Sequence, residues 1–208
     1  MTKLYKLTDE KGKTRAKGSE LQWGEGVAHT AKGEGTKLCT NGVIHAYEHP
    51  LIAIVMCPIH AAFHEMRLWE AEGEIVAREG QLKCGVKTLT TVREIPVLEI
   101  TLEQRVRFAI ACAMEVCQEE YFVQWAQKWL SGEDRRKDRA WLPRGETKIA
   151  ETAWLAAGSA AEVKEYEETK HANWRIGGMT KVARTAQAIF ELCPDMDFVR
   201  LIEQALGC

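Results

Sequence analysis

The sequence lacks the long apolar segments that membrane insertion or secretion requires. Its longest apolar run covers residues 51–56, whereas a membrane-spanning helix needs about 20 apolar residues. The N-terminal stretch MTKLYKLTDEKGK is polar and charged and has no apolar core of a signal peptide. We therefore expect a protein of the cytoplasm with no membrane partner.

The sequence also lacks a cysteine framework. It has no CxxC pair, and an odd number of irregularly spaced cysteines does not suggest a set of disulfides. We expect reduced thiols, and we expect Cys112, which lies in an apolar helical pattern, to act as a small hydrophobic residue. The seven cysteines are Cys39, Cys57, Cys84, Cys112, Cys117, Cys193 and Cys208.

Phosphate-binding motifs and a strong overall charge are missing as well. The sequence contains neither GxxxxGK[ST] nor GxGxxG, and its net charge is only -2. Such a charge gives no general field for nucleic acid, so binding of DNA or RNA would need a local basic patch. The glycines of WGEG and KGEG are better explained by turns.

The chain changes character near residue 100. Glycine-containing turns and short β-type runs precede this point, and alanine-rich helical patterns follow it. This arrangement predicts an α+β protein with a mixed or antiparallel sheet domain at residues 1–100. Residues 101–208 should form a helical region of four or five helices.

Three stretches of the N-terminal half read as strands. KLYKLT and RLWEAEGEIV alternate apolar and polar residues, and KTLTTVREI is rich in β-branched residues up to Pro96. KLCT-NG-VIHAY predicts a hairpin with a type I′ turn at Asn-Gly. Residues 16–36 read as a long loop ordered around Trp23. Pro50 suits the first turn of a helix, and Pro58 should end it, kink it or start another.

The C-terminal half begins with Thr101 and Gln104, which resemble a capping box before a helix over about 102–118. A second helix should end at Gly132. The stretch KIAETAW to HANW is helix-prone throughout, and two further helices should be separated by Pro194. Asp195 is a reasonable N-cap for the last helix.

The N-terminal half resembles a domain of unknown function found in proteins of tailed phages and prophages. The resemblance rests on LYKLTDEKGKTR, QWGEGVAHTA, LCTNGVIHAYEHPLIAIVMCPIHA, LWEAEGEI and KTLTTVREIPVLEITLEQRVRFAI, and it runs to about residue 118. Members commonly carry an alanine-rich helical tail, which the C-terminal part resembles. The resemblance implies a phage protein made inside a bacterium, often an accessory factor, but no established chemistry.

A weaker similarity points to ADP-ribosyltransferases. The order of LYK, GVIHAYEHPLIA and VREI resembles the succession of strands and site residues in that fold. Such an enzyme needs a group that holds the nicotinamide ribose, aromatic rings and a carboxylate that stabilises positive charge in the transition state. Under this alternative NAD is the cofactor, and the candidate catalytic residues are Tyr5, His45, Tyr47, Glu48 and Glu94.

Two further kinds of site are suggested more weakly. His60 and His64 share a helix face beside Cys57, but HxxxH lacks the glutamate of HExxH, so we predict no metal site. The stretch DRRKDRAWLPRGETK is the densest basic group, although acidic residues offset much of its charge. Its nucleic-acid-binding candidates are Arg135, Arg136, Lys137, Arg139 and Trp141.

The sequence therefore leaves two functions of different classes open. The first is a phage accessory protein that binds a host protein or ribonucleoprotein complex, including an anti-CRISPR-like inhibitor of host defence. The second is an ADP-ribosyltransferase-like enzyme. The helical tail could also support a homodimer, although no sustained heptad predicts a coiled coil.

Overall fold

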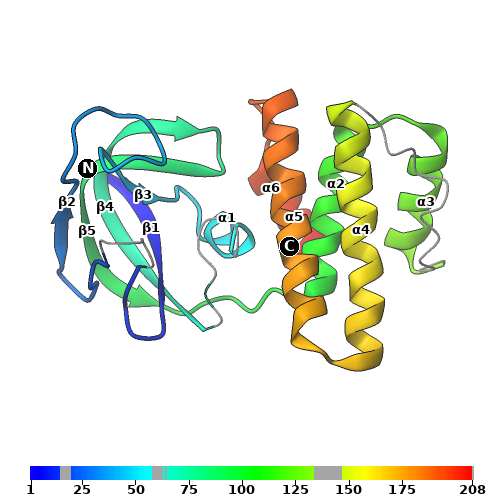
Figure 1. Cartoon of the computed structure of the whole chain (residues 1–208), viewed down its shortest axis with the longest axis horizontal. Helices are drawn as coiled ribbons and strands as arrows, with labels where there is room; N and C mark the ends of the chain where they lie inside the picture. Colours follow the sequence, from blue (N-terminus) through cyan, green and yellow to red (C-terminus); the bar gives the residue numbers. More distant parts are fainter. Residues whose placement is uncertain (15–19, 58–62, 64, 134–146, 208) are drawn as a thin grey trace. The chain divides into compact units, whose positions relative to one another are not determined.

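The computed structural model describes residues 1–14, 20–57, 63, 65–133 and 147–207. It divides into two compact units, Met1–Glu99 and Ile100–Cys208 (Figure 1). The first contains an antiparallel sheet and the second contains helices, so the predicted α+β class is confirmed. None of the helices within the described ranges is both long and apolar enough to cross a membrane.

The sheet is built around two long strands that form a hairpin. These strands, β4 and β5, lie between β1 and β2 in the order β1-β4-β5-β2, and β3 pairs with β5 as well. All pairings are antiparallel, and the three strands predicted from alternation and β-branching are confirmed. The strands are β1 (Thr2–Asp9), β2 (Ala28–Thr30), β3 (Ile44–Ala46), β4 (Met66–Glu79) and β5 (Lys83–Ile95).

The sheet curls until its two sides meet. Tyr5 in β1 pairs with Tyr47, directly after β3, through two backbone hydrogen bonds of 2.8 and 3.0 Å. Because β1 also pairs with β4, and β3 with β5, the four strands form a closed ring of neighbours. This closure places β3 beside β1, although about forty residues separate the two strands in the sequence.

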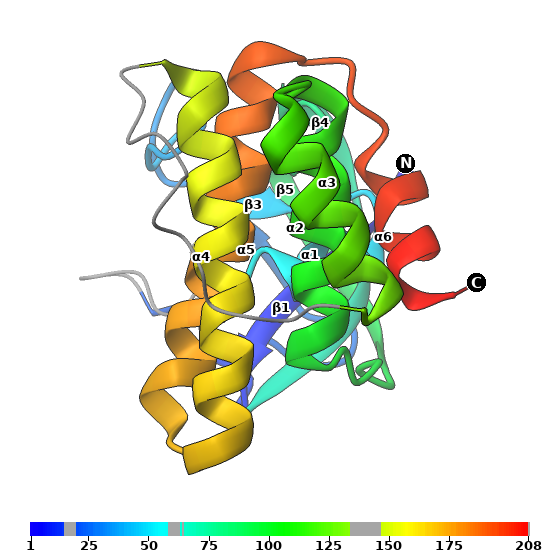
Figure 2. The same cartoon turned by 90° about the vertical axis from the view of Figure 1, so that its right-hand side faces the viewer.

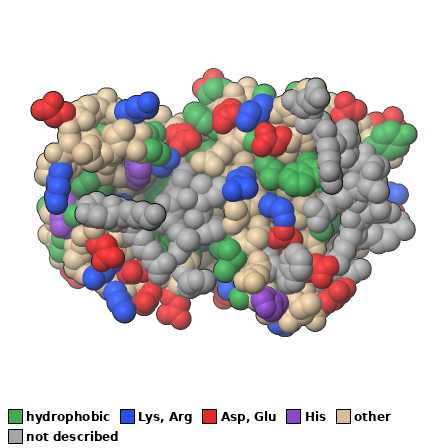
Figure 3. Space-filling view, in the orientation of Figure 1, with side chains coloured by type: hydrophobic (Ala, Val, Ile, Leu, Met, Phe, Trp, Pro, Cys, Tyr) green, Lys and Arg blue, Asp and Glu red, His purple; other side chains and the backbone are tan. Residues whose placement is uncertain are grey.

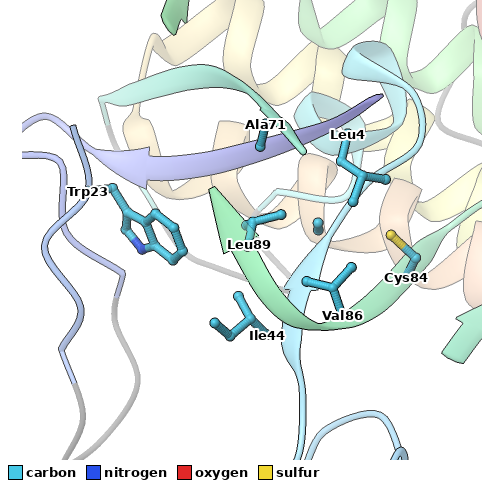
Figure 4. Close-up of a cluster of buried hydrophobic side chains, with 8 residues drawn as sticks. Leu4, Trp23, Ile44, Ala71, Cys84, Val86 and Leu89 are labelled. Carbon is cyan, nitrogen blue, oxygen red and sulfur yellow. The ribbon is translucent and has the colours of Figure 1, made fainter. Parts of the chain in front are cut away.

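The inner face of the ring is filled with apolar side chains (Figure 4). Trp23, which the sequence predicted to order the long loop, is 2% exposed and belongs to this core. The loop prediction missed β2, whose three residues carry too short a pattern to detect. The core residues are Leu4, Trp23, Ile44, Ala46, Ala71, Cys84, Val86 and Leu89.

The predicted hairpin at Asn41-Gly42 is wrong. Residues 37–40 form no strand, β3 pairs with β5 instead, and neither Asn41 nor Gly42 has a positive φ. The left-handed residue is Cys39, with φ of 61°. The reason is tertiary, because the Lys87 ammonium in β5 donates to the carbonyls of three loop glycines, including Gly42 at 2.8 Å.

Helix α1 (Pro50–Val55) begins at the predicted proline. His49 caps it, because its Nδ1 accepts a hydrogen bond from the amide of Leu51 at 3.3 Å. The helix ends at Met56 before Pro58, as expected of a proline stop. The second helical segment predicted after Pro58 lies outside the described residues, as do His60 and His64.

Five helices lie in the described part of the second unit. The capping box of Thr101 and Gln104 is confirmed by reciprocal hydrogen bonds of 3.1 and 2.9 Å. Gly132 ends its helix in the left-handed conformation, as predicted. The helices are α2 (Leu102–Val116), α3 (Glu120–Ser131), α4 (Lys148–Thr169), α5 (Ala172–Leu192) and α6 (Phe198–Leu206).

Two predictions about helix ends are wrong. The stretch that reads as one helix to HANW breaks at Lys170, whose left-handed φ of 53° ends α4 before α5 starts. The N-cap of α6 is Asp197 rather than Asp195, because the Asp197 carboxylate accepts a hydrogen bond from the amide of Arg200 at 3.0 Å. The break between α4 and α5 carries no glycine or proline, whereas Pro194 lies between α5 and α6 as predicted.

Helices α4 and α5 lie side by side, and α2 packs against both (Figures 1 and 2). The close approach depends on glycine, because a Cβ on Gly177 would lie 2.3 Å from Oε2 of Glu162. Glu162 is 5% exposed and forms an ion pair with Lys181 of α5. Its Oε2 has no hydrogen-bond partner. A buried ion pair therefore joins the two longest helices.

Candidate functional site

The curled sheet brings three of the predicted site residues together. Tyr5 and Tyr47 are backbone partners, and His45 lies two residues before Tyr47 in β3. Three further polar residues lie around His45, contributed by β1, the loop before β3 and β5. We call Lys6, Cys39, His45 and Lys83 the β3 cluster.

His45 is fixed on both sides by hydrogen bonds. Its Nε2 accepts from the backbone amide of Cys39 at 2.9 Å, and its carbonyl accepts from Nζ of Lys6 at 2.6 Å. Burial, with the positive charges of Lys6 and Lys83, lowers the pKa of His45 to about 4. The imidazole is therefore neutral at pH 7, and the Cys39 amide occupies the lone pair that a general base would use.

Lys6 places an amine inside the sheet ring. It follows Leu4 on the inward-facing side of β1 and is 8% exposed. Burial lowers the pKa of its ammonium to about 8. The amine lies 5.5 Å from the ring centre of Trp23, whose buried Nε1 has no hydrogen-bond partner. Removing the Lys6 amine from water costs free energy. The hydrogen bond to the His45 carbonyl and the face of the Trp23 ring offset part of this cost.

Cys39 and Lys83 form the outer part of the cluster. The Lys83 ammonium lies 3.5 Å from Sγ of Cys39 and 2.8 Å from the carboxylate of Glu79. Lys83 is buried, with 5% of its side chain exposed, whereas Cys39 is exposed. The thiol therefore covers a buried amine.

The other cysteines that the structure describes differ from Cys39. None of the six forms a disulfide, and Cys39 is the exposed one among them. Burial raises the pKa of the Cys84 thiol to about 12 and raises the pKa of Cys112 well above its ordinary value. Cys112 is fully buried, which confirms its predicted packing role.

Tyr47 contributes packing and backbone pairing rather than an accessible hydroxyl. It is 5% exposed, and burial raises the pKa of its phenol far above the ordinary value. The Glu48 carboxylate beside it accepts two hydrogen bonds from Arg78, at 2.8 and 3.2 Å. Two of the proposed catalytic groups therefore have structural contacts.

Glu94 is separated from Tyr5 by strand β4 and is engaged in its own ion pair. Glu94 in β5 pairs with Trp69 of β4, and Trp69 in turn pairs with Lys6 of β1, so β4 lies between Glu94 and the strand of Tyr5. Arg67 donates two hydrogen bonds to the Glu94 carboxylate and thereby lowers its pKa. The structure thus groups Tyr5, His45 and Tyr47 without Glu94.

The remaining predicted sites are not visible. Arg135, Arg136, Lys137, Arg139 and Trp141 all lie outside the described residues. Within the described part of the chain, no group of three or more His, Cys, Asp or Glu side chains is arranged to hold a metal ion. Cys57, which lies beside His60 and His64 in the sequence, donates a hydrogen bond from its thiol to the carbonyl of Phe63 at 3.7 Å.

Sequence reasoning missed three members of the β3 cluster. Lys6 had a detectable signal, because strand alternation places it on the same face as Leu4. Cys39 and Lys83 had none, since their contact joins residues 44 positions apart. Only the pairing of β3 with β5 brings them together.

Residues 2–103 match the model of a family described as a domain of unknown function, DUF7666. The match covers the whole sheet unit and ends at the start of α2. No curated protein and no solved structure matches the chain. The first unit is therefore similar to this family's domain, and the similarity brings no assigned activity with it.

Proposed function

We propose that this chain is a phage-encoded accessory protein that binds a protein component of its bacterial host. A host defence complex, as in anti-CRISPR inhibition, is the expected class of target. The phage context rests on the resemblance of the N-terminal half to a domain of phage and prophage proteins. The binding mode rests on the surface of the helical unit.

The observation that carries the proposal is an exposed tryptophan in an otherwise buried part of α4. Every described side chain from 152 to 163 is buried except Trp154, which is 37% exposed. A helix covered on nearly all sides gains no packing from an indole that faces water. Tryptophan and tyrosine are the residues that most often anchor protein interfaces.

Other apolar side chains on the helical unit support this reading. Tyr121 on α3 is 76% exposed, Ile149 on α4 is 41% exposed and Ile176 on α5 is 37% exposed. Figure 3 shows hydrophobic side chains at the surface of this unit beside lysines and arginines. Exposed aromatic side chains surrounded by polar residues are common at protein-binding surfaces.

The enzyme alternative has no comparable support. An ADP-ribosyltransferase-like site needs a carboxylate beside the nicotinamide ribose, and the Glu94 carboxylate is instead engaged by two hydrogen bonds from Arg67. Calorimetric titration with NAD is the direct check. Binding of NAD accompanied by release of nicotinamide would restore the enzyme hypothesis and count against the binding proposal.

The binding proposal is tested by affinity capture from lysates of bacterial hosts. The full chain should retain a host protein in stoichiometric amount, and a Tyr121→Ser/Trp154→Ser variant should retain at least about tenfold less, since each anchor contributes on the order of 1–2 kcal/mol. Leu98→Ser, at an apolar residue of the sheet unit that is 51% exposed, is the matched control. Equal retention by the helical variant would contradict the proposal.

A further inference from the structure

The pair of Cys39 and Lys83 has a geometry suited to covalent chemistry. The exposed thiol sulfur lies 3.5 Å from the buried Lys83 amine. The hydrogen bond from the Cys39 amide to His45 holds the residue in its left-handed conformation and keeps its side chain over β5. Glu79 holds the amine from the other side at 2.8 Å. Both reacting atoms are therefore positioned before any reagent arrives.

We propose that Cys39 and Lys83 form an oxidative modification site, in which a hydroperoxide links the two side chains through a sulfur–nitrogen bond. Sulfenic acids condense with nearby nitrogen atoms to give sulfenamides. The usual partner is a backbone nitrogen, and here the nearest basic nitrogen is the Lys83 amine. The link would tie the loop before β3 to β5.

The reaction balances in two steps. The Cys39 sulfur first attacks the hydroperoxide, the O–O bond breaks, and the products are Cys39–SOH and an alcohol or water. The Lys83 ammonium gives one proton to the Glu79 carboxylate. The amine then attacks the oxidised sulfur, and the S–O bond breaks as water leaves with a second proton from nitrogen. Sulfur loses two electrons to the peroxide, and the pair loses two hydrogen atoms in total.

The surroundings make the reaction selective and reversible. Cys84 is the cysteine next to Lys83 in β5, and its thiol stays protonated because burial raises its pKa to about 12. A thiolate is the form that peroxides oxidise, so Cys84 is a poor competitor. A small thiol can attack the Cys39 sulfur of the link, release the Lys83 amine and, with a second equivalent, restore the free thiol.

The test treats the full chain with hydrogen peroxide and examines tryptic peptides by mass spectrometry. The expected product joins peptide 38–67 to peptide 79–87, with a mass lower by two hydrogen atoms. Trypsin should fail to cleave after Lys83 in this product, because the modified side chain no longer carries a free ammonium. Addition of a small thiol should return both peptides and restore cleavage.

Two variants separate the link from a disulfide, since peptide 79–87 also contains Cys84. Lys83→Arg should abolish the joined product, and Cys84→Ala should leave it intact. A joined product that trypsin still cleaves after Lys83, or that disappears in Cys84→Ala, is a disulfide and overturns the proposal. Oxygen added to Cys39 without any joined peptide overturns it as well. The cleavage result needs only the wild-type chain, so it decides the question even if a variant does not fold.

Discussion

Lys6 and His45 of the sheet unit are buried in a different way from Glu162 of the helical unit. The sheet unit encloses Lys6 and His45 without an opposite charge beside them, and burial moves the pKa of each toward its neutral form. The helical unit buries Glu162 together with Lys181, so each charge meets its opposite. Isolated groups make stability depend on pH, whereas a pair makes it depend on both partners being present.

The surfaces of the two units differ as well. On the sheet unit, Glu48, Glu70 and Glu94 all accept hydrogen bonds from arginines of neighbouring strands. On the helical unit, Tyr121 and Trp154 expose aromatic surface. Both units expose apolar side chains, but the exposed aromatic ones in the described part of the chain belong to the helical unit. This contrast supports assigning binding to the helices.

The largest expected effect comes from breaking the buried pair of the helical unit. Lys181→Met should lower the free energy of unfolding by about 3 kcal/mol, because it leaves the Glu162 carboxylate buried beside Gly177 with no counter-charge. Glu162→Met/Lys181→Met should lie within about 1 kcal/mol of the wild type, since no charge remains. Urea denaturation at pH 7 measures both. Equal destabilisation by the single and double variants would contradict this account.

In the sheet unit, Lys6 should make stability rise with pH between about 8 and 10.5. In this window the unfolded chain holds a proton that the folded chain has released, so raising the pH favours folding. The difference between wild type and Lys6→Met should change by about 3 kcal/mol across the window. Denaturation of both proteins at several pH values isolates Lys6 from other groups. A constant difference would show that burial does not shift this lysine.

His45 should produce a smaller effect at acidic pH. Its folded pKa of about 4 lies below its ordinary value of 6.5, so the unfolded chain takes up the proton first, and stability falls as the pH drops from 6.5 toward 4. After a discount for its partial exposure we expect about 2 kcal/mol. His45→Gln keeps an acceptor for the Cys39 amide and should flatten this part of the pH profile. An unchanged profile would assign the acid sensitivity to other residues.

The smallest effect belongs to the exposed pair of Arg67 and Glu94. Arg67→Gln and Glu94→Gln should each cost less than about 1 kcal/mol, because both side chains are more than a third exposed and water screens their attraction. Thermal unfolding of the two variants and of the wild type measures this loss of stability. A loss of several kcal/mol would mean that the sheet unit relies on its surface ion pairs.

The elements that the sequence predicts well are those defined by local signals. The capping box at Thr101, the proline start of α1 and the alternation in β4 all follow from neighbouring residues. The hairpin at Asn41-Gly42 fails because Lys87, more than forty residues away, holds the loop by its carbonyls. Local turn preference is weaker than three hydrogen bonds to one ammonium.

The candidate sites show the same difference between features set by neighbouring residues and features set by distant ones. Alternation in β1 puts Lys6 on the same face as Leu4, but a lysine on an apolar face does not by itself indicate a site. The contact of Cys39 with Lys83 depends on the pairing of β3 with β5, which no short pattern announces. The exposure of Trp154 is equally hidden, since its helix is rich in alanine and gives no clear apolar face.

The most direct test compares one variant from each unit in binding to the captured host protein. Tyr121→Ser/Trp154→Ser changes the helical surface, and His45→Gln/Glu94→Gln changes the residues expected to act in catalysis. We predict that the helical variant raises the dissociation constant at least about tenfold and that the sheet variant leaves it unchanged. A sheet variant that loses binding while the helical variant retains it would contradict the central claim.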